Sequence, residues 1–382
     1  MSGGEIGGPE MLKVLHFVAG NLYGGVEAYL ATVAKLGSLV PEVRHEFAVC
    51  YQGRLFEELN SHQAFVHELG SVRISRPWTV WKARSVLERI VGSRGIDVVV
   101  THGSWPHLVA GNAARRAGAR LVYFTHDNLA RVSWGDRIAA RVAPDLILAN
   151  SQFTLDAACR LFPNCPALVC YLPVESFDIP QDGRNTVRRD FKVSNDCTVI
   201  IQVSRLERWK GHVTLLEALG RISNVKNWEA WIVGGAQRPR EIEYFQELQA
   251  LAARLGIAQR IRFLGQRNDV RRILAAADVF CQANLQPEPF GIAFVEALYS
   301  GLPVVTSDFG GGKEIVGETC GILTPPGDTD ALAETLCHLI QSTDERRRIA
   351  AKGPTRAWEL CDPRAHFRSF CRAISHIPPY AA

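Results

Sequence analysis

Short runs of apolar, β-branched residues alternate with segments of helical spacing along most of this chain. In the N-terminal half the runs are "LKVLHFV" (12–18), "HEFAVC" (45–50), "AFVHEL" (64–69), "IDVVVTH" (96–102), "RLVYFTHD" (120–127) and "DLILANS" (145–151). Strands that are joined through helices lie parallel in one sheet, with right-handed crossovers and helices on both faces. The pattern therefore predicts an α/β fold with a doubly wound parallel sheet.

The alternation restarts after a Pro- and Gly-rich stretch at 171–183. The later runs are "CTVIIQVS" (197–204), "WEAWIVGG" (228–235), "IRFLG" (261–265), "DVFCQAN" (278–284) and "PVVTSD" (303–308). Because 382 residues exceed the size of one average domain, we expect two Rossmann-like domains joined by this linker. In such sheets ligands bind at the carboxyl ends of the strands, so polar residues directly after strands are the candidates for a site.

Composition restricts the class of protein. The ten cysteines form no C-x-x-C pair, which predicts buried, reduced thiols and a cytoplasmic protein. The first ten residues lack the features of a signal peptide, and no apolar run is long enough to span a bilayer. A net charge of +4 is too small to indicate nucleic acid as a partner.

The charge is nevertheless uneven. Residues 71–94 contain five Arg and one Lys against a single Glu, a local charge of +5. Together with Trp78 and Trp81 this stretch would suit docking on anionic lipid, which would place the protein at the inner face of a membrane. The alternative, common for Arg-rich helices, is a solvated helix face beside tryptophans that belong to the core.

Two loops that follow strands carry residues suited to phosphate. Gly24 and Gly25, in "NLYGGVE", precede a helix and would let backbone N–H groups approach an anion. Arg205 and Lys210, in "VSRLERWKGH", follow the strand "TVIIQV" and would place two cations at the edge of the sheet. Cations in this position stabilise a diphosphate leaving group without a metal ion.

Familiar nucleotide motifs are absent. No G-x-G-x-x-G follows a strand, which disfavours a nicotinamide-dependent dehydrogenase. "SDFGGGK" is not a P-loop, because Ser307 replaces the first glycine and Glu314 replaces the Ser or Thr. We therefore expect a nucleotide to be held by other means.

A set of motifs resembles one family closely. "SRL…KG", "FLGQRNDV" with "LAAADVF", "PEPFGIAFVEAL", "GLPVVTSDFGGGKEIV" and "GILTPPGD" are similar to the second domain of retaining glycosyltransferases of the family 4 type. "LYGGVEAYL", "DVVVTH", "FTHD" and "ANS" extend the resemblance into the first half. The resemblance covers about 12–330 and implies the GT-B fold, in which two Rossmann-like domains face each other across a cleft.

The resemblance also implies a domain plan. A flexible N-terminus (1–10) would precede an acceptor-side domain (11–173) and a nucleotide-sugar-binding domain (174–360). The last segment (361–382) would hold a helix that crosses back to the first domain.

Site residues follow by matching motifs. Glu288 and Glu296 are the ends of the family's E-x₇-E signature, which implies that Glu288 faces the donor sugar and Glu296 the ribose. Between them, Pro289, Phe290, Gly291 and Ile292 would begin a helix whose free N–H groups meet sugar and phosphate. Arg267 would lie near the nucleobase. His126 would contact the donor sugar, and His102 and Asp127 would lie in the acceptor cleft.

The resemblance implies a metal-independent retaining hexosyltransferase that needs no cofactor. Its donor would be a nucleotide diphosphate sugar, with a UDP-sugar favoured, and its acceptor a hydroxyl of a glycan, a lipid-linked sugar or a small molecule. In the catalytic set we place His126, Arg205, Lys210 and Glu288.

Three other readings of these residues stay open. The two glutamates would also suit a glycosidase. The fold would also suit a non-catalytic nucleotide-sugar or glycan-binding protein, or an epimerase or phosphorylase.

Overall fold

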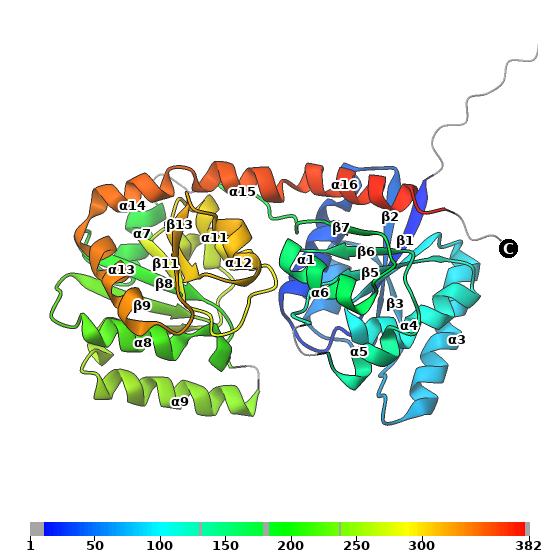
Figure 1. Ribbon diagram of the computed structural model, residues 1–382, viewed down its shortest axis with the longest axis horizontal. Helices are drawn as coiled ribbons and strands as arrows, with labels where there is room; N and C mark the ends of the chain where they lie inside the picture. The colour runs from blue at the N-terminus through cyan, green and yellow to red at the C-terminus, as the bar shows by residue number, and fades with distance from the viewer. Residues whose placement is uncertain (1–10, 130–131, 179–182, 237, 379–382) are drawn as a thin grey trace, which may run out of the picture. The chain divides into compact units, whose positions relative to one another are not determined.

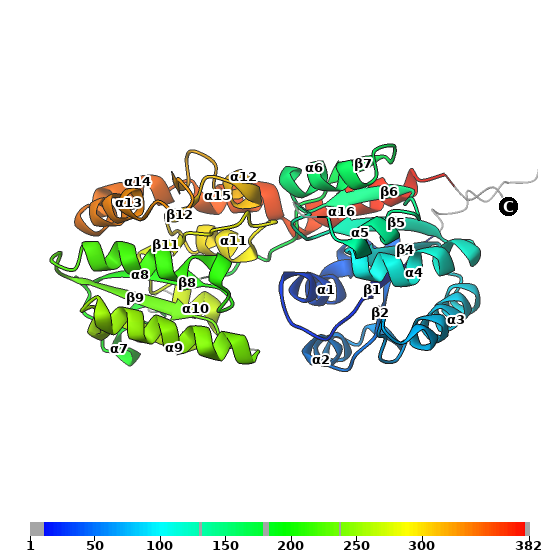
Figure 2. The same ribbon diagram turned by 60° about the horizontal axis from the view of Figure 1, so that its bottom comes forward.

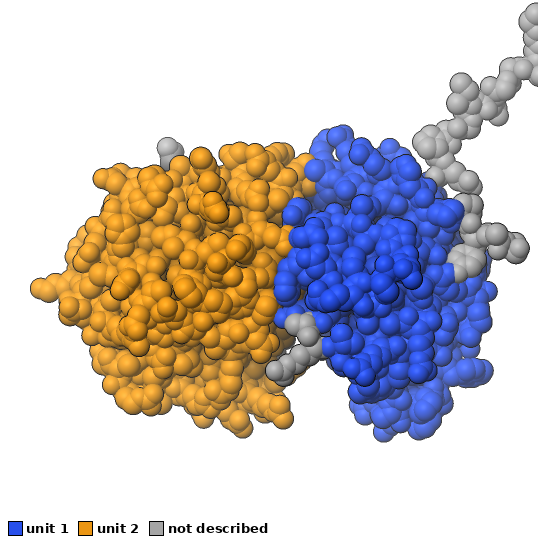
Figure 3. Space-filling view, viewed as in Figure 1, with its two compact units in different colours: residues 1–173, 363–382 blue, residues 174–362 orange. Residues whose placement is uncertain are grey.

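The computed structural model describes residues 11–129, 132–178, 183–236 and 238–378. The chain divides into two compact units, residues 1–173 with 363–382, and residues 174–362 (Figure 3). The second boundary lies two residues beyond the expected 360, because Cys361 ends a helix of the second unit. The segment 1–10 that we expect to be flexible lies outside the described residues, as do 179–182 of the expected linker.

Unit 1 is built on a seven-stranded sheet with the order β3-β2-β1-β4-β5-β6-β7 (Figure 1). All of its strand pairs are parallel. The strands are β1 Leu12–Val18, β2 Val43–Val49, β3 Phe65–Glu68, β4 Val98–His102, β5 Arg120–Thr125, β6 Leu146–Ala149 and β7 Ala167–Val169. The helices are α1 Gly25–Leu36, α2 Arg54–Ser61, α3 Pro77–Arg94, α4 Ser104–Arg116, α5 Trp134–Ala139, α6 Gln152–Leu161 and α16 Pro363–Ser375.

Unit 2 repeats the plan with a six-stranded parallel sheet of order β10-β9-β8-β11-β12-β13. The strands are β8 Thr198–Val203, β9 Trp228–Val233, β10 Ile261–Gly265, β11 Val279–Gln282, β12 Val304–Ser307 and β13 Gly321–Thr324. The helices are α7 Gly183–Asp190, α8 His212–Arg221, α9 Pro239–Arg254, α10 Val270–Leu274, α11 Ile292–Tyr299, α12 Gly310–Val316, α13 Thr329–Gln341, α14 Thr343–Ala350 and α15 Gly353–Cys361. Short 3₁₀ turns occur at Gly37–Leu39, Arg208–Lys210 and Ala258–Arg260.

Helices cover both faces of each sheet, as alternating apolar strands require (Figure 2). In unit 2, α8, α9 and α13 pack on one face of β8, β9 and β11. On the other face the rings of Phe280 in β11 and Phe294 in α11 meet edge to face, with centroids 5.7 Å apart. The predicted fold class, two doubly wound parallel sheets, is confirmed, and the order of strands reverses between β1 and β4 and between β8 and β11. Ligands of doubly wound sheets bind at such reversals.

Two expectations about individual side chains need correction. Trp78 and Trp81 at the start of α3 are 65% and 72% exposed, so the interpretation that they belong to the core is wrong. The cysteines are all free thiols, but only five of the ten are fully buried. The other five are only partly buried, namely Cys159, Cys165, Cys197, Cys337 and Cys371.

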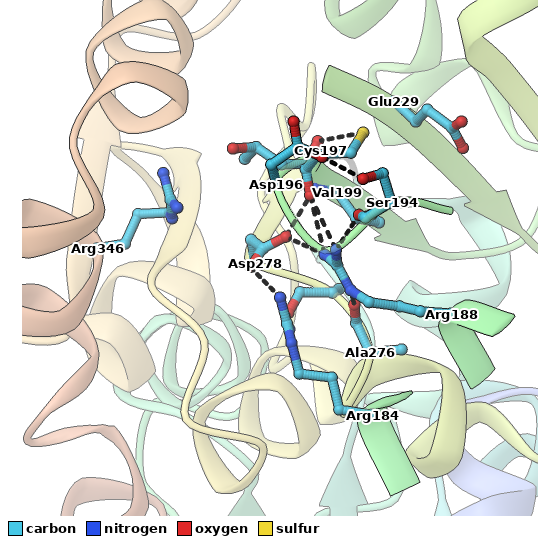
Figure 4. Close-up of polar contacts among 12 residues, drawn as sticks. Arg184, Arg188, Ser194, Asp196, Cys197, Val199, Glu229, Ala276, Asp278 and Arg346 are labelled. Carbon is cyan, nitrogen blue, oxygen red and sulfur yellow. Dashed lines mark hydrogen bonds and ion pairs between the residues drawn. The ribbon is translucent and has the colours of Figure 1, made fainter. Parts of the chain in front are cut away.

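A buried arginine ties α7 to the amino-terminal edge of the second sheet (Figure 4). Arg188, 1% exposed, pairs with Asp278 at 2.5 Å and also donates to the carbonyl oxygens of Ala276, Ser194 and Cys197. Asp278 in turn accepts from the backbone N–H of Val199 in β8. One carboxylate therefore connects a helix and two strand starts, and it also pairs with the more exposed Arg184 at 2.6 Å.

We predict that Arg188→Met destabilises unit 2 by about 1–3 kcal/mol, because three carbonyl oxygens lose their buried donor while Arg184 still pairs with Asp278. Hydrogen exchange of the β8 and β11 amides would measure this loss. The neighbouring Arg189 is exposed, so Arg189→Met should change stability by less than about 0.5 kcal/mol. Equal protection in the two variants would contradict the structural role of the pair.

Candidate active site

A glycine allows the loops after β8 and β11 in unit 2 to lie in close contact. Gly211 has φ +74°, and a Cβ there would lie 1.6 Å from the carbonyl oxygen of Ala283. The backbone N–H of Leu285 donates to the carbonyl of Trp209 at 2.7 Å across the same contact. No other residue fits at position 211, and the close approach carries Lys210 to the chain segment that follows β11.

Lys210 and Glu288 form a largely buried ion pair at this edge of the sheet. Lys210 Nζ lies 2.5 Å from Glu288 Oε2 and 3.9 Å from the centroid of the Trp209 ring. The two side chains are 12% and 11% exposed. The structure thus brings together two residues that are 78 positions apart and that the sequence predicts for the same site.

Two amides that we did not predict complete the surroundings of this carboxylate. Gln282 Nε2 and Asn284 Nδ2 lie 3.1 and 3.2 Å from Glu288 Oε2, and both residues are buried. Both stand at the end of the strand run "DVFCQAN". Polar residues at the end of an apolar strand are candidates for a site, so the sequence alone could have indicated these two. They orient Glu288 and supply further donors at the carboxyl end of β11.

The turn from Glu288 to Gly291 leads into α11, and Gly291, with φ +102°, occupies the N-cap. Phe290 is buried, and the helix begins at Ile292, the last of the four residues that we expect to begin it. The glycines of "DFGGGK" press against this turn, since a Cβ at Gly310 or Gly311 would lie 2.7 Å from Glu288 O or 2.3 Å from Pro289 O. Glycine is needed at these positions because the two backbones pack closely. This close packing, rather than phosphate binding by a P-loop, explains the Gly-rich stretch.

The other predicted residues of unit 2 have partners of their own. Arg205, a third exposed, pairs with Glu207 at 3.1 Å. Arg267 forms a two-pronged pair with Asp269, with both contacts at 2.8 Å. Neither contact involves Lys210 or Glu288.

Glu296, on α11, lies 3.4 Å from Arg271 of α10, a residue that we did not predict. Burial raises the pKa of Glu296, and the positive charge of Arg271 offsets part of that rise.

In unit 1 the predicted glycines begin α1. Gly24 is the N-cap, and its backbone N–H donates to the side chain of Glu27 at 2.9 Å. Gly25 is exposed, and a Cβ placed on it would meet no atom within 4 Å. The first turn of α1 is therefore open to a ligand at the carboxyl end of β1.

His102 and His126 lie together at the ends of β4 and β5, with His102 Nδ1 2.9 Å from His126 Nε2. The second nitrogen of His102 is 3.0 Å from His16 Nδ1, which leaves His102 no free ring nitrogen for an acceptor. His126 Nδ1 is buried and has no partner among the described residues. Asp127 is exposed beside Gly103. Of the two histidines, His126 is therefore the one with an available ring nitrogen at the edge of the sheet.

The described part of the chain holds no group of three or more His, Cys, Asp or Glu side chains placed to bind a metal ion.

Two family models match consecutive parts of the chain. Residues 23–175 match "Glycosyltransferase Family 4", and residues 183–356 match "Glycosyl transferases group 1". The first match falls within unit 1 except for its last two residues, and the second falls within unit 2.

Proteins with similar sequences are also glycosyltransferases by name. The chain is 29% identical to a GDP-mannose-dependent alpha-(1-6)-phosphatidylinositol monomannoside mannosyltransferase of Mycolicibacterium smegmatis, over 88% of this chain and 90% of that protein. A related mannosyltransferase of Corynebacterium glutamicum is 27% identical over 77% and 80%. The crystal structure of Anabaena HepE with UDP and glucose superposes with a TM-score of 0.83 at 26% identity, covering 96% of this chain and all of that one. The chain therefore belongs to the glycosyltransferases of the family 4 type, and its fold is GT-B.

Proposed function

We propose that this glycosyltransferase is metal-independent, retains the configuration of the sugar that it moves, and takes that sugar from a nucleoside diphosphate. The observation that carries the proposal is the Lys210–Glu288 pair, which lies beside the first turn of α11 at the strand reversal of unit 2. A cation, a carboxylate and backbone N–H groups at the start of a helix are what a sugar diphosphate requires: charge for the phosphates, acceptors for the hydroxyls and donors for the phosphate oxygens.

Each residue has a distinct role in this proposal. Lys210 contacts the diphosphate, and Glu288 accepts hydrogen bonds from hydroxyls of the sugar. Arg205 exchanges its partner Glu207 for a phosphate oxygen, which the one-third exposure of the Arg205 side chain allows. The N–H groups of Phe290, Gly291 and Ile292 face the phosphate and sugar, with Pro289 leading into the turn. In unit 1, the exposed Gly25 at the first turn of α1 offers a further N–H donor, whereas the N–H of Gly24 would first have to release Glu27.

The remaining predicted residues would bind the ends of the donor. Glu296 accepts from the ribose, Arg267 lies near the base, and His126 meets the sugar through its free Nδ1. His102 contacts His126 rather than the acceptor. The exposed Asp127 is therefore the residue that we propose on the acceptor side.

The chemistry follows from the charges. The bond between the anomeric carbon and the phosphate oxygen breaks, and the acceptor oxygen bonds to the same face of that carbon. The acceptor proton passes to the departing phosphate oxygen, so no protein base is required. Lys210 and Arg205 stabilise the negative charge that develops as the phosphate leaves, in the way that pre-positioned donors stabilise an oxyanion.

The names of the relatives suggest donors and acceptors to test. UDP-sugars remain our first choice, since HepE is solved with UDP and with UDP-glucose. GDP-mannose is the second, since two relatives are named as GDP-mannose-dependent. The same two relatives are named for phosphatidylinositol monomannoside, a lipid-linked acceptor. The donor that raises the melting temperature most, by RT ln(1 + [L]/Kd), is the one to use in the assays below.

We predict that Lys210→Ala lowers kcat by on the order of 10²–10³, as expected for a donor that acts on charge developing in the transition state. Steady-state kinetics with the best donor would measure this. Lys226 is exposed and lies before β9, at the opposite edge of the sheet, so Lys226→Ala is the matched control and should keep full activity. Turnover of Lys210→Ala close to that of Lys226→Ala would overturn the role of Lys210.

The stereochemical prediction concerns the first product formed. With an α-linked donor, proton NMR of the early reaction should show an α-linked product, and excess EDTA should leave the rate unchanged. A β-linked product would refute retention, and loss of activity that Mg²⁺ or Mn²⁺ restores would refute metal independence. Tight donor binding without transfer or hydrolysis would support the alternative, a non-catalytic nucleotide-sugar-binding protein.

We also propose that α3 attaches the enzyme to anionic lipid at a membrane surface. No helix in the described ranges is long and apolar enough to cross a bilayer. Trp78 and Trp81, one helical turn apart, are exposed, as are the cations Arg73, Arg76, Lys82 and Arg89. Arg84 and Arg94 of the same stretch face inward, to the carbonyls of Leu108 and Val109 and to Glu46. Exposed tryptophans beside free cations suit the interface of an anionic bilayer.

The double variant Trp78→Ala/Trp81→Ala should bind phosphatidylinositol-containing vesicles at least about tenfold more weakly, because burying a large apolar side chain contributes about 1.5–3 kcal/mol. Co-sedimentation with vesicles would measure the change. Trp358 on α15 is also half exposed, and Trp358→Ala should bind as the wild type does. Equal binding by the two variants would contradict attachment through α3.

A further inference from the structure

Four histidines in unit 1 form one continuous hydrogen-bonded chain. Each comes from a different strand or strand end: His45 from β2, His16 from β1, His102 from β4 and His126 just after β5. The distances are 2.9 Å from His45 Nδ1 to His16 Nε2, 3.0 Å from His16 Nδ1 to His102 Nε2, and 2.9 Å from His102 Nδ1 to His126 Nε2. Because β2, β1, β4 and β5 are adjacent in the sheet, the chain of rings runs obliquely across it, from the amino-terminal half of β2 to the carboxyl end of β5.

The packing of these rings is as regular as their hydrogen bonds. Successive rings have centroids 5.2 Å apart and are tilted by only 26–27°. His16, His102 and His126 are buried, whereas His45 is partly exposed. The chain therefore connects a histidine near the surface to a buried one at the edge where ligands of such sheets bind.

All four rings are neutral at ordinary pH. Burial lowers the pKa of His45 and of His126 to about 3, and it holds the pKa of His16 and of His102 well below the usual value. The titratable groups that pack against the chain are Tyr29 of α1 and His366 of α16. Burial lowers the pKa of His366 to about 4 and raises that of Tyr29, so both are uncharged.

Neutrality couples the four tautomers. A neutral imidazole has one N–H and one lone pair. Every link in this chain joins the Nδ1 of one ring to the Nε2 of the next, so each link is satisfied when all four protons are on Nε2 or all four are on Nδ1. A mixed chain would set two N–H groups, or two lone pairs, against each other at about 3 Å inside the core, where an unmet hydrogen bond costs about 1–3 kcal/mol.

We propose that His45, His16 and His102 are positioning residues that set the tautomer of His126, and so decide whether His126 Nδ1 presents an N–H or a lone pair to a hydroxyl of the bound sugar. This rests on the proposed function for the identity of the ligand. His126 Nδ1 is the buried end of the chain, and it has no partner among the described residues.

Interchange of the two states conserves protons. From the state with all protons on Nε2, His45 Nε2 releases a proton to water and three protons move, one along each link toward His45. His126 Nδ1 then takes one proton from the ligand or from water. Each ring ends with its single proton on Nδ1.

Ring nitrogen-15 NMR of the free protein tests the coupling without any ligand, because protonated and unprotonated ring nitrogens have well-separated shifts. His107 donates from Nε2 to Val142 O at 2.8 Å, and His366 donates from Nδ1 to Tyr171 O at 2.7 Å, so the protein contains a reference for each tautomer. We expect His16, His45, His102 and His126 to share one tautomer. Different tautomers among the four would overturn the proposal.

His16→Phe cuts the chain two links away from His126 and keeps an aromatic ring among Phe47, Phe370 and the neighbouring histidines. In this variant His126 should populate both tautomers, and its KM for the donor should rise. His107→Phe removes a buried histidine that lies outside the chain and should leave the four tautomers unchanged. An unaltered His126 spectrum in His16→Phe would overturn the coupling.

Addition of the best-binding nucleotide sugar separates this proposal from the proposed function. A donor that binds and shifts the His126 signals supports the role at the sugar. A donor that binds without shifting them overturns that role, even if the four tautomers are shared. If no nucleotide sugar binds at all, the proposed function fails, whereas the coupling of tautomers is still decided by the spectrum of the free protein.

Discussion

The ion pair between Lys210 and Glu288 is the interaction on which the donor site depends. Two charges that are each only about one-tenth exposed have lost most of their water, and such a pair is stable only when its geometry is good and further hydrogen bonds support it. Gln282 and Asn284 donate to the same carboxylate oxygen, Oε2, that Lys210 contacts, and the ring of Trp209 lies against the ammonium group. Such an arrangement is poorly explained by stability alone, because an apolar pair would serve at least as well. It is well explained by a ligand that brings both charge and hydroxyls.

Close backbone packing is what makes this pair possible. Gly211 lets the loop after β8 touch the chain after β11, and Gly310 and Gly311 let the start of α12 touch the turn at Glu288. In each case a Cβ would collide with a carbonyl group, so the contacts require glycine. The parallel strands bring the site residues together, because their carboxyl ends lie at one edge of the sheet. Lys210, Glu288 and the first turn of α11 all follow such strand ends and so lie close to one another.

The sequence predicted the fold well because its signal is local. Apolar runs such as "IDVVVTH" and "CTVIIQVS" are long enough to indicate strands. The segments between the runs have helical spacing, and strands joined through helices pair in parallel. The three-residue strand β7 and the strand β13 carry weaker signals and were not identified as strands. In the site, the motifs placed Lys210 and Glu288 at one edge, and the structure pairs them.

What the sequence could not predict depends on contacts between distant residues. Nothing local says that Arg271 lies beside Glu296, or that His16 and His45 continue a chain that ends at His126. The orientation of α3 was equally hidden, since Trp78 and Trp81 stand at helical spacing that suits either a core or a surface. Such features follow from the register and packing of whole elements, and single-sequence patterns do not contain them.

The most direct test of the account is an experimental structure of the protein with UDP or GDP bound. We predict that the diphosphate lies within hydrogen-bonding distance of Lys210 Nζ and of the backbone N–H groups at the start of α11. A diphosphate bound elsewhere, with Lys210 still closed onto Glu288 and no phosphate oxygen near either, would contradict it.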